Sequence, residues 1–443
     1  MLCLEMTLRR RLGRTGIAVS AVGFGGYRVD LTTPAHLAAL RLALARGINL
    51  VDTASSHREG ASERLIGAAL TEVEAGAVTV VTKVGGGMEP GRIDIELAGS
   101  LGRLGRPRVE VYLLDSPEAF VSALRRRRDP RPLRVLREIL YERLGHAFAE
   151  LERLRAAGRI GWYGVSSDGL SAPVEHPAAL SLERLLALAQ HAGGARHGFA
   201  VVEVPLNLLE SGAALGAGGA GSLLEQARAH DLGVLTNRPL NALHRGELAR
   251  LADPVPRAGH TSLEDGLAFV AALEREWRSE HAPALGAEAA SWFSWSDELG
   301  RAFRAGAIHG LPHLCELEER GVWPAVAEAL ADAPGAAAWG GRYRTALQAL
   351  LDALHDAVVA RTREAYAPLR AALTAALPGW PSADSERLPP LSQVALRTVL
   401  DTPGVSCVLL GARRPAYVED ALAAAALPPV PDALELYRAM RAV

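Results

Sequence analysis

Short apolar stretches rich in valine, isoleucine and leucine alternate along the chain with longer segments whose apolar residues recur three and four positions apart. The short stretches are typical of buried parallel strands, and the longer spacing is typical of amphipathic helices. The pattern predicts eight strands, at residues 21–26, 48–54, 78–84, 109–114, 160–166, 199–205, 233–237 and 405–410. Alternating strands and helices in this number predict the α/β class, a (β/α)8 TIM barrel, whose active site lies at the carboxyl ends of the strands.

Two local patterns add detail to this barrel. The segment LRRRLGRTGIAVS, residues 8–20, predicts a hairpin ahead of the first barrel strand. In PAHLAALRLALARG the apolar spacing predicts a helix that begins at Pro34 and ends before Gly47. Proline suits the first position of a helix, and glycine suits the position after its last turn.

The regular spacing breaks between the seventh and eighth strands. A large helical insertion separates strand seven from the following barrel helix and is far longer than an ordinary connection, with helices predicted at 263–276, 325–331 and 342–377. Its borders, ADPVPRAG and LPGWPSADSERLPP, are proline-rich, as is typical of a domain edge. The predicted division is therefore 9–241 for the first part of the barrel, 242–388 for the insertion and 389–443 for the rest of the barrel.

Six of the seven tryptophans lie in this insertion: Trp277, Trp292, Trp295, Trp323, Trp339 and Trp380. We interpret them as a small core of the insertion and its contact with the barrel, and the alternative is that some line a substrate pocket. Because the insertion leaves the barrel at its catalytic face, it is a candidate lid. Its helices could also contact a second copy of the chain or a protein partner.

Composition excludes several classes of function. A net charge of −2 and a hydrophobic fraction of 49% indicate a globular chain with no electrostatic case for binding nucleic acid or a membrane surface. Cys3, Cys315 and Cys407 are far apart, so neither a disulfide framework nor a cysteine zinc site is expected. Since no apolar stretch is long enough for a membrane span or a secretory signal, we expect a cytoplasmic protein.

Titratable residues follow three consecutive predicted strands. Asp52 and His57 lie in GINLVDTASSHREG at the end of the second strand, Lys83 lies in VTVVTKVG, and Asp115 lies in VYLLDSPE. Because the carboxyl ends of barrel strands meet at one mouth, these four side chains are expected to converge there. They are the candidate catalytic residues.

These segments resemble the aldo/keto reductase family, whose second strand reads roughly G-I-N-x-x-D-T-A-x-x-Y-G-x-G-x-S-E. Asp52 and Lys83 stand where the family has its catalytic aspartate and lysine, whereas His57 replaces the acid tyrosine and Asp115 replaces a histidine. In the family the paired lysine lowers the pKa of the tyrosine, and the histidine orients the carbonyl. The resemblance implies an NAD(P)H-dependent oxidoreductase acting on a small carbonyl or sugar-like substrate.

The resemblance also implies contacts to the nicotinamide. In GVSSDG, Ser166 matches the family pattern and Ser167 replaces an asparagine. Glu203 replaces a glutamine of the sixth strand, and Asn237 replaces the tyrosine that stacks on the nicotinamide. Arg238 follows it in the stretch NRPLNA, which is similar to a long-insert branch of the family.

After the eighth strand, LLGARRPAYVEDALAA resembles the family segment that binds the adenosine ribose phosphate. The resemblance places Gly411, Arg413 and Arg414 at this phosphate. Guanidinium groups suit a 2′-phosphate because they offer several donors in a fixed geometry, so NADPH is the expected cofactor.

The chemistry of the altered site depends on the protonation state of His57. Imidazole is the commonest general acid and base, so His57 could take the place of the tyrosine. A nearby charged Lys83 would lower the pKa of His57, while Asp52 and Asp115 would raise it, and the sign of the net shift stays open. Asp115 opposes a developing oxyanion unless it is protonated or the reaction passes through a cationic state.

Three functions therefore remain open, with the first favoured. The first is NADPH-dependent carbonyl reduction through an atypical His57/Lys83/Asp52 proton relay. The second is a non-catalytic binding or regulatory barrel whose insertion meets a protein partner. The third is changed chemistry, in which His57, Asp52, Asp115 and Glu203 hold zinc or manganese, although the nearby charge of Lys83 argues against this metal set.

Overall fold

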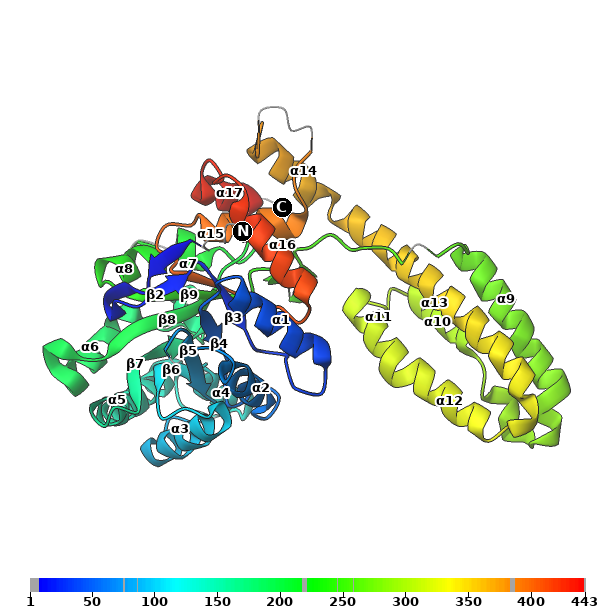
Figure 1. Cartoon of the computed structure of the whole chain (residues 1–443), viewed down its shortest axis with the longest axis horizontal. Coiled ribbons are helices and arrows are strands. Elements are labelled where there is room, and N and C mark those ends of the chain that lie inside the picture. Colours follow the sequence, from blue (N-terminus) through cyan, green and yellow to red (C-terminus); the bar gives the residue numbers. More distant parts are fainter. Residues whose placement is uncertain are drawn as a thin grey trace. The chain divides into compact units, whose positions relative to one another are not determined.

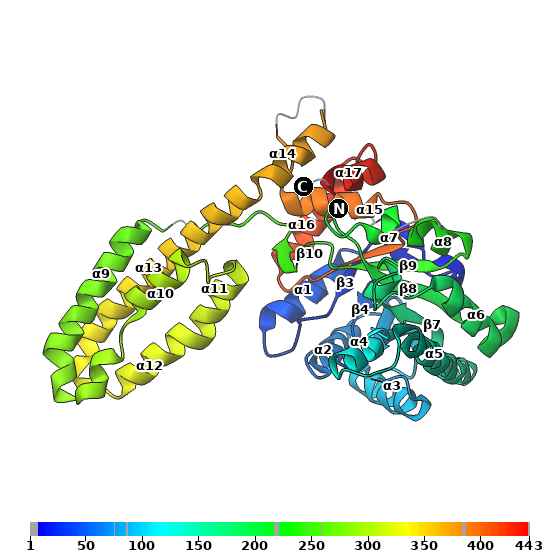
Figure 2. The same ribbon diagram turned by 180° about the vertical axis from the view of Figure 1, so that it is seen from behind.

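A computed structural model describes residues 8–441 except 75, 86, 217–220, 245, 258 and 383–386, so Cys3 and part of the second proline-rich border lie outside the described residues. Eight parallel strands form a closed barrel in the order β12-β3-β4-β5-β6-β7-β8-β9, surrounded by helices (Figure 1). The predicted (β/α)8 TIM barrel is confirmed. Figure 2 shows the same barrel from behind.

The barrel strands lie where the apolar stretches predict them. They are β3 (Val22–Gly25), β4 (Leu50–Asp52), β5 (Thr79–Val84), β6 (Val109–Asp115), β7 (Ile160–Ser166), β8 (Phe199–Pro205), β9 (Gly233–Asn237) and β12 (Cys407–Leu410). Each predicted range contains its strand, except that β6 extends one residue further, to Asp115.

Amphipathic helices cover the outside of the barrel. They are α1 (Pro34–Ala45), α2 (Ala61–Leu70), α3 (Pro90–Leu104), α4 (Ala119–Arg126), α5 (Leu133–Ala156), α6 (Leu182–Gly193), α7 (Gly212–Leu215), α8 (Leu223–Ala229), α15 (Leu391–Leu400), α16 (Pro415–Ala426) and α17 (Ala433–Met440). As predicted, Pro34 opens α1, and Gly47 follows its end with a φ of 86°.

A hairpin of β1 (Arg9–Arg11) and β2 (Ala18–Ser20) packs against the amino-terminal end of the barrel. Its Leu12 is fully buried and contacts Gly233, the first residue of β9. A side chain at Gly13 would overlap the backbone of Gly233, so the turn requires glycine there. With this end occupied by the hairpin, the polar side chains at the carboxyl ends of the strands are the ones left to form a site.

A second hairpin follows β9 directly. It pairs β10 (Asn241–His244) with β11 (Glu247–Arg250), and Gly246 lies in its turn with a φ of 83°. Contacts divide the chain into two compact units: Met1–Ala252 with Ala372–Val443, and Asp253–Ala371. The hairpin therefore belongs to the barrel unit.

The second unit is helical, as the apolar spacing predicts. Its helices are α9 (Leu263–Glu276), α10 (Trp295–Arg304), α11 (Leu311–Leu317), α12 (Trp323–Ala331) and the long α13 (Ala337–Ala365). Within the part of the chain that the structure describes, no helix is long and apolar enough to cross a membrane.

The single helix predicted at 342–377 needs correction. The chain forms α13 and then α14 (Ala367–Ala376), with a turn at Tyr366 between them. Pro368 explains the break, because it has no N–H to donate to the carbonyl of Glu364, four residues earlier. Apolar spacing alone continues across this position and does not show the break.

Aromatic rings form the core of the second unit. The ring of Trp339 lies 4.9 Å from Trp277, 4.8 Å from Phe293 and 4.8 Å from Tyr343, measured between centroids. Partly buried Trp292, Trp295 and Trp323 pack against this core. Trp380 belongs to the barrel unit, where its indole N–H donates to the carbonyls of Pro428 and Pro429.

Replacing Trp339 with alanine is expected to destabilise the second unit by about 3–5 kcal/mol, because it removes a fully packed indole. Calorimetric unfolding of the full chain measures the change. The control is Phe269→Ala on α9, whose ring is 60% exposed, with an expected change below about 0.5 kcal/mol. Equal losses in the two variants would contradict the assignment of Trp339 to the core.

Candidate active site

Lys83 on β5 is the centre of a buried polar cluster. Its ammonium donates to the carboxylate of Asp52 at the end of β4 and lies 3.3 Å from the carbonyl oxygen of Thr53 and 3.0 Å from Oε2 of Glu203 on β8. Lys83, Asp52 and Glu203 are buried, with only 2%, 4% and 3% of their surface exposed. The contacts with Asp52 and Thr53 are hydrogen bonds, whereas the contact with Glu203 is an ion pair in which Oε2 accepts no hydrogen bond.

The cluster holds more negative than positive groups. Burial alone would lower the pKa of Lys83, but Asp52, Glu203 and Asp115 together outweigh burial and raise it. Burial, followed by the charge of Glu203, raises the pKa of Asp52. Three carboxyl groups share one ammonium, so the site favours keeping a proton on a carboxyl or accepting a further cation.

Lys83 is the only lysine in the chain; every other residue in the combined lysine and arginine count is an arginine. Arginine has a planar fork of donors, whereas lysine presents a compact ammonium with three rotating donors. The three oxygens around Nζ suit the ammonium. The single lysine thus occupies a buried position where oxygens of Asp52, Thr53 and Glu203 surround its charge.

His57 lies in the loop after β4 and is 9% exposed. Burial, followed by the charge of Lys83, lowers the pKa of His57 to about 3. The direction that the sequence left open is therefore downward, and the ring is neutral at neutral pH. Its Nδ1 is buried without a hydrogen-bond partner, and its ring meets the exposed ring of Tyr27 edge-on at 5.2 Å.

Asp115 ends β6, where it is paired in register with Ser166 of β7. Its Oδ1 accepts a hydrogen bond of 3.2 Å from the hydroxyl of Ser116. Burial raises the pKa of Asp115, while Lys83 acts in the opposite direction. The structure therefore brings Asp115 within the electrostatic reach of Lys83, although the two make no ion pair.

The predicted nicotinamide contacts are partly occupied by other groups. Asn237 Nδ2 donates to Glu203 Oε1 at 2.8 Å, and Asn237 Oδ1 is buried without a partner. The hydroxyl of Ser167 donates to Glu118 at 2.7 Å and accepts from the backbone N–H of Gly169. Ser166 is buried beside them.

Sequence reasoning missed Glu118, whose pKa burial raises. It lies in the loop after β6, where the rule for strand ends could have found it. Tyr27, which follows β3, escaped notice although the same rule applies.

Arg238 joins two loops of the barrel mouth. Its guanidinium lies 3.0 Å from Asp168 after β7 and 2.8 Å from Glu210 after β8. Neither carboxylate was predicted as its partner. Both sides of the guanidinium contact acids, so Arg238 links these two loops.

Gly411, Arg413 and Arg414 lie on the segment after β12 and are exposed. Arg414 precedes the first turn of α16. Among the described residues, the side chains of the two arginines show no hydrogen bond or ion pair. Their guanidinium groups are therefore available to an anion at the start of this helix.

The metal set suggested by the sequence does not assemble. No three of His57, Asp52, Asp115 and Glu203 bring ligand atoms within 4.8 Å of one another. The physical reason is Lys83, whose ammonium occupies the space between Asp52 and Glu203. Within the described residues one such group exists, Glu276, Glu280 and His281 of the second unit, and there Glu276 is already paired with Arg342.

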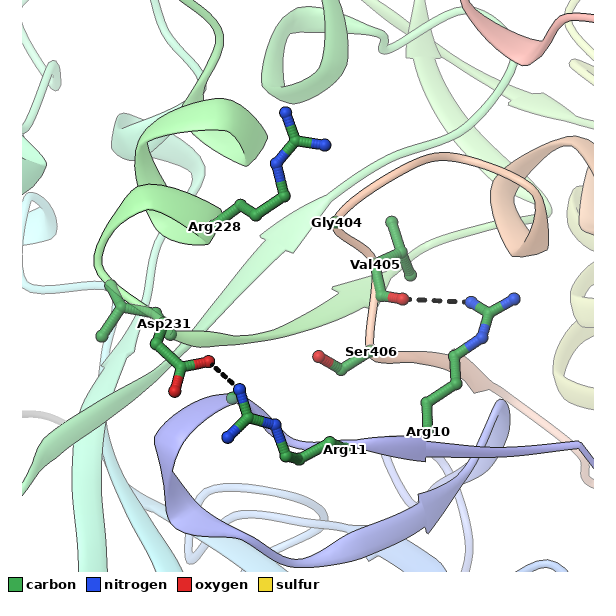
Figure 3. A pocket seen from close by; sticks show the side chains of 9 residues that line it. Arg10, Arg11, Arg228, Asp231, Gly404, Val405 and Ser406 are labelled. Carbon is green, nitrogen blue, oxygen red and sulfur yellow. Dashed lines mark hydrogen bonds and ion pairs between the residues drawn. The ribbon is translucent and has the colours of Figure 1, made fainter.

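A cleft of about 200 Å³ lies at the opposite end of the barrel (Figure 3). Arg10 donates to the carbonyl of Val405 at 3.0 Å, and Arg11 pairs with Asp231 at 2.5 Å. These residues belong to the first hairpin and to the segments that precede β9 and β12. The cleft is therefore separate from the residues at the carboxyl ends of the strands.

His57 is expected to weaken the fold in acid. Its folded pKa lies below the unfolded value of about 6.5, so its contribution to stability is full above pH 6.5 and is lost as the pH falls toward 3. The loss approaches about 1.4 kcal/mol per pH unit. In His57→Gln this part of the acid dependence, measured by denaturant unfolding between pH 7 and 4, should disappear. An unchanged dependence would show that His57 is not neutral in the folded protein.

Lys83 is expected to stay protonated at a pH where a free lysine is half neutral. Since the chain has one lysine, protein labelled with carbon-13 lysine gives one Cε signal, which at pH about 10.4 should report the ammonium form. The stability linked to this raised pKa is present below that pH and is lost above it. Asp52→Asn should lower the midpoint and the surface change Glu435→Gln should not. A midpoint at or below 10.4 in the native protein would contradict the cluster.

Comparison with known proteins agrees with the fold. The aldo/keto reductase family model matches residues 21–242. Aldo-keto reductase AKR11C1 from Bacillus halodurans (holo form) is 16% identical, with a TM-score of 0.50 over 98% of this chain and 96% of that chain. Glycerol dehydrogenase AKR11B4 from Gluconobacter oxydans is 18% identical, with a TM-score of 0.50 over 99% and 94%. At these identities the likeness to the two structures shows the fold alone.

No curated protein sequence matches the chain. The matched family residues make up half of the chain and contain Asp52, His57, Lys83 and Asp115. This chain belongs to the aldo/keto reductase family.

Proposed function

We propose that this protein is an NADPH-dependent oxidoreductase that acts on a polar double bond of a small molecule at the carboxyl ends of the barrel strands. The observation that carries the proposal is the buried cluster of Asp52, Lys83 and Glu203. A buried ion pair seldom stabilises a fold more than apolar packing does. A function at the barrel mouth accounts for the energetic penalty of keeping these charges there.

Two features of the chain fit a nicotinamide dinucleotide. The orphaned Oδ1 of Asn237 can accept a hydrogen bond from a carboxamide N–H. The exposed guanidinium groups of Arg413 and Arg414 suit a phosphate, and a 2′-phosphate in particular. When bound, such a dinucleotide supplies hydride.

The chain's own residues set the electrostatics of the reaction. Lys83 contacts Asp52, Thr53 and Glu203, so its role is to balance the charge of the two carboxylates and hold the ends of β4, β5 and β8 in place. His57 is neutral and has one donor and one acceptor nitrogen. In a His57/Lys83/Asp52 relay, the group that faces a carbonyl oxygen would be the N–H of this neutral ring.

NADPH binding tests the proposal. Calorimetric titration should show binding of NADPH, and the double variant Arg413→Ala/Arg414→Ala should bind it about tenfold or more weakly, since a hydrogen bond to a charged group contributes about 1.5–3 kcal/mol. The affinity for NADH should change less in this double variant, because NADH has no 2′-phosphate. Arg126→Ala, an exposed arginine of α4, is the control.

If neither nucleotide binds, the proposed function is wrong. The second candidate, a partner-binding barrel, would then be favoured, and the engagement of Lys83 by Asp52, Thr53 and Glu203 is the observation that supports it. If NADPH binds but the arginine variants match the native protein, only the phosphate site is wrong.

His57 should be needed for turnover. His57→Ala is expected to lower kcat by about 100-fold or more, the usual contribution of a group that exchanges a proton or hydrogen bond with the reacting atom. His57→Tyr restores the family residue and should raise turnover of a carbonyl substrate. Unchanged kinetics in both variants would remove His57 from the mechanism.

A further inference from the structure

Several hydrogen-bond donors at the barrel mouth are already engaged. The ammonium of Lys83 donates to Asp52 and to the carbonyl of Thr53, and it forms an ion pair with Glu203. The amide N–H of Asn237 donates to Glu203, and the hydroxyl of Ser167 donates to Glu118.

Acceptors remain open beside them. His57 Nδ1 and Glu203 Oε2 are buried without hydrogen-bond partners, and the carboxylate of Asp115 accepts one bond from Ser116. A carbonyl oxygen offers acceptors only, so these acceptors cannot bind it, and the N–H of the neutral His57 ring is the donor that could. A ligand with a polar N–H would match them.

The distribution of charge also favours a ligand with a polar N–H over a carbonyl. Asp52, Asp115 and Glu203 surround one ammonium, and the ring of His57 is neutral. Carbonyl reduction builds negative charge on oxygen, which nearby carboxylates oppose. A cationic substrate builds no negative charge when it is reduced. The carboxylates stabilise its positive charge when it binds.

We propose that the substrate is a small protonated imine, with Asp115 beside its positive charge and His57 accepting its N–H. This inference rests on the proposed oxidoreductase function and names the substrate class. His57 accepts through Nδ1 when its proton is on Nε2. Asp115 then stabilises the cation where the family's histidine would orient a carbonyl.

The step balances without a proton donor at the site. Hydride brings one hydrogen and its electron pair to the imine carbon, and the C=N π bond breaks. The π pair becomes the lone pair of an amine nitrogen, so the iminium is reduced and the dinucleotide is oxidised. The neutral amine takes up a proton from water afterwards. The absence of a charged proton donor is therefore no obstacle.

A pair of probes of the same shape separates the two substrate classes. 2-Methyl-1-pyrroline is a cyclic imine, and 2-methylcyclopentanone is a carbonyl of similar size. The native protein with NADPH should reduce the imine at least tenfold more efficiently. Without turnover, calorimetry should detect pyrrolidinium, the cationic ring, and find no comparable binding of cyclopentanol.

Asp115→Asn keeps the shape of the side chain and removes its charge. It should weaken pyrrolidinium binding and lower kcat/KM for the imine, each about tenfold or more, as expected for loss of a charge-assisted contact. Its affinity for NADPH should stay near the native value, which shows that the site is folded. Glu435→Gln, which removes an exposed carboxylate of α17, is the matched control and should change neither quantity.

The double variant His57→Tyr/Asp115→His restores the two family residues. It should lose imine preference and gain carbonyl reduction. If the native protein binds NADPH yet prefers the ketone, or if Asp115→Asn binds pyrrolidinium as the native protein does, this inference alone is overturned. If NADPH does not bind, the proposed function and this inference fall together.

Discussion

The ammonium of Lys83 is the contact on which the site depends, because it alone offsets the charge of several carboxyl groups buried at the carboxyl ends of β4, β5 and β8. Without it, Asp52 and Glu203 would lie close together in a poorly solvated space, and like charges in such a space repel strongly. The ammonium is also bound to the carbonyl of Thr53. Lys83 thus holds the strand ends at the barrel mouth together. His57, Asp115 and Asn237 are the residues that we expect to contact a ligand there.

Backbone strain marks the same region. Six non-glycine residues among those described have positive φ, and four of them, Arg58, Glu59, Ser116 and Arg238, lie within two residues after His57, Asp115 or Asn237. Such conformations are unfavourable and persist where the surrounding structure holds them. Arg58 is held by its ion pair with Asp30 at 2.7 Å, and Arg238 by Asp168 and Glu210. The loops at the mouth are therefore shaped by these ion pairs.

The barrel strands were predictable because each is a short apolar run between helical segments, and strand ends fix which side chains meet. Asp52, Lys83 and Glu203 come together for that reason. The pKa of His57 was not predictable, since its direction depends on how deeply the loop after β4 buries the ring. The partners of Ser167 and Arg238 lie on loops without a periodic signal. The break at Tyr366 was readable from Pro368 but not from apolar spacing.

A chain with one buried lysine also has an unusual surface. Its outward-facing cations on the side chains are guanidinium groups or histidines, because the sole ε-amine is enclosed. Guanidinium stays charged throughout the pH range in which proteins are handled. The arginines therefore keep the surface's positive charge nearly constant in mild alkali. Acylating reagents and sugars that attack amines find no lysine on the folded chain. Proteases that cleave after lysine or arginine can therefore cut the accessible backbone of the folded chain only after arginine.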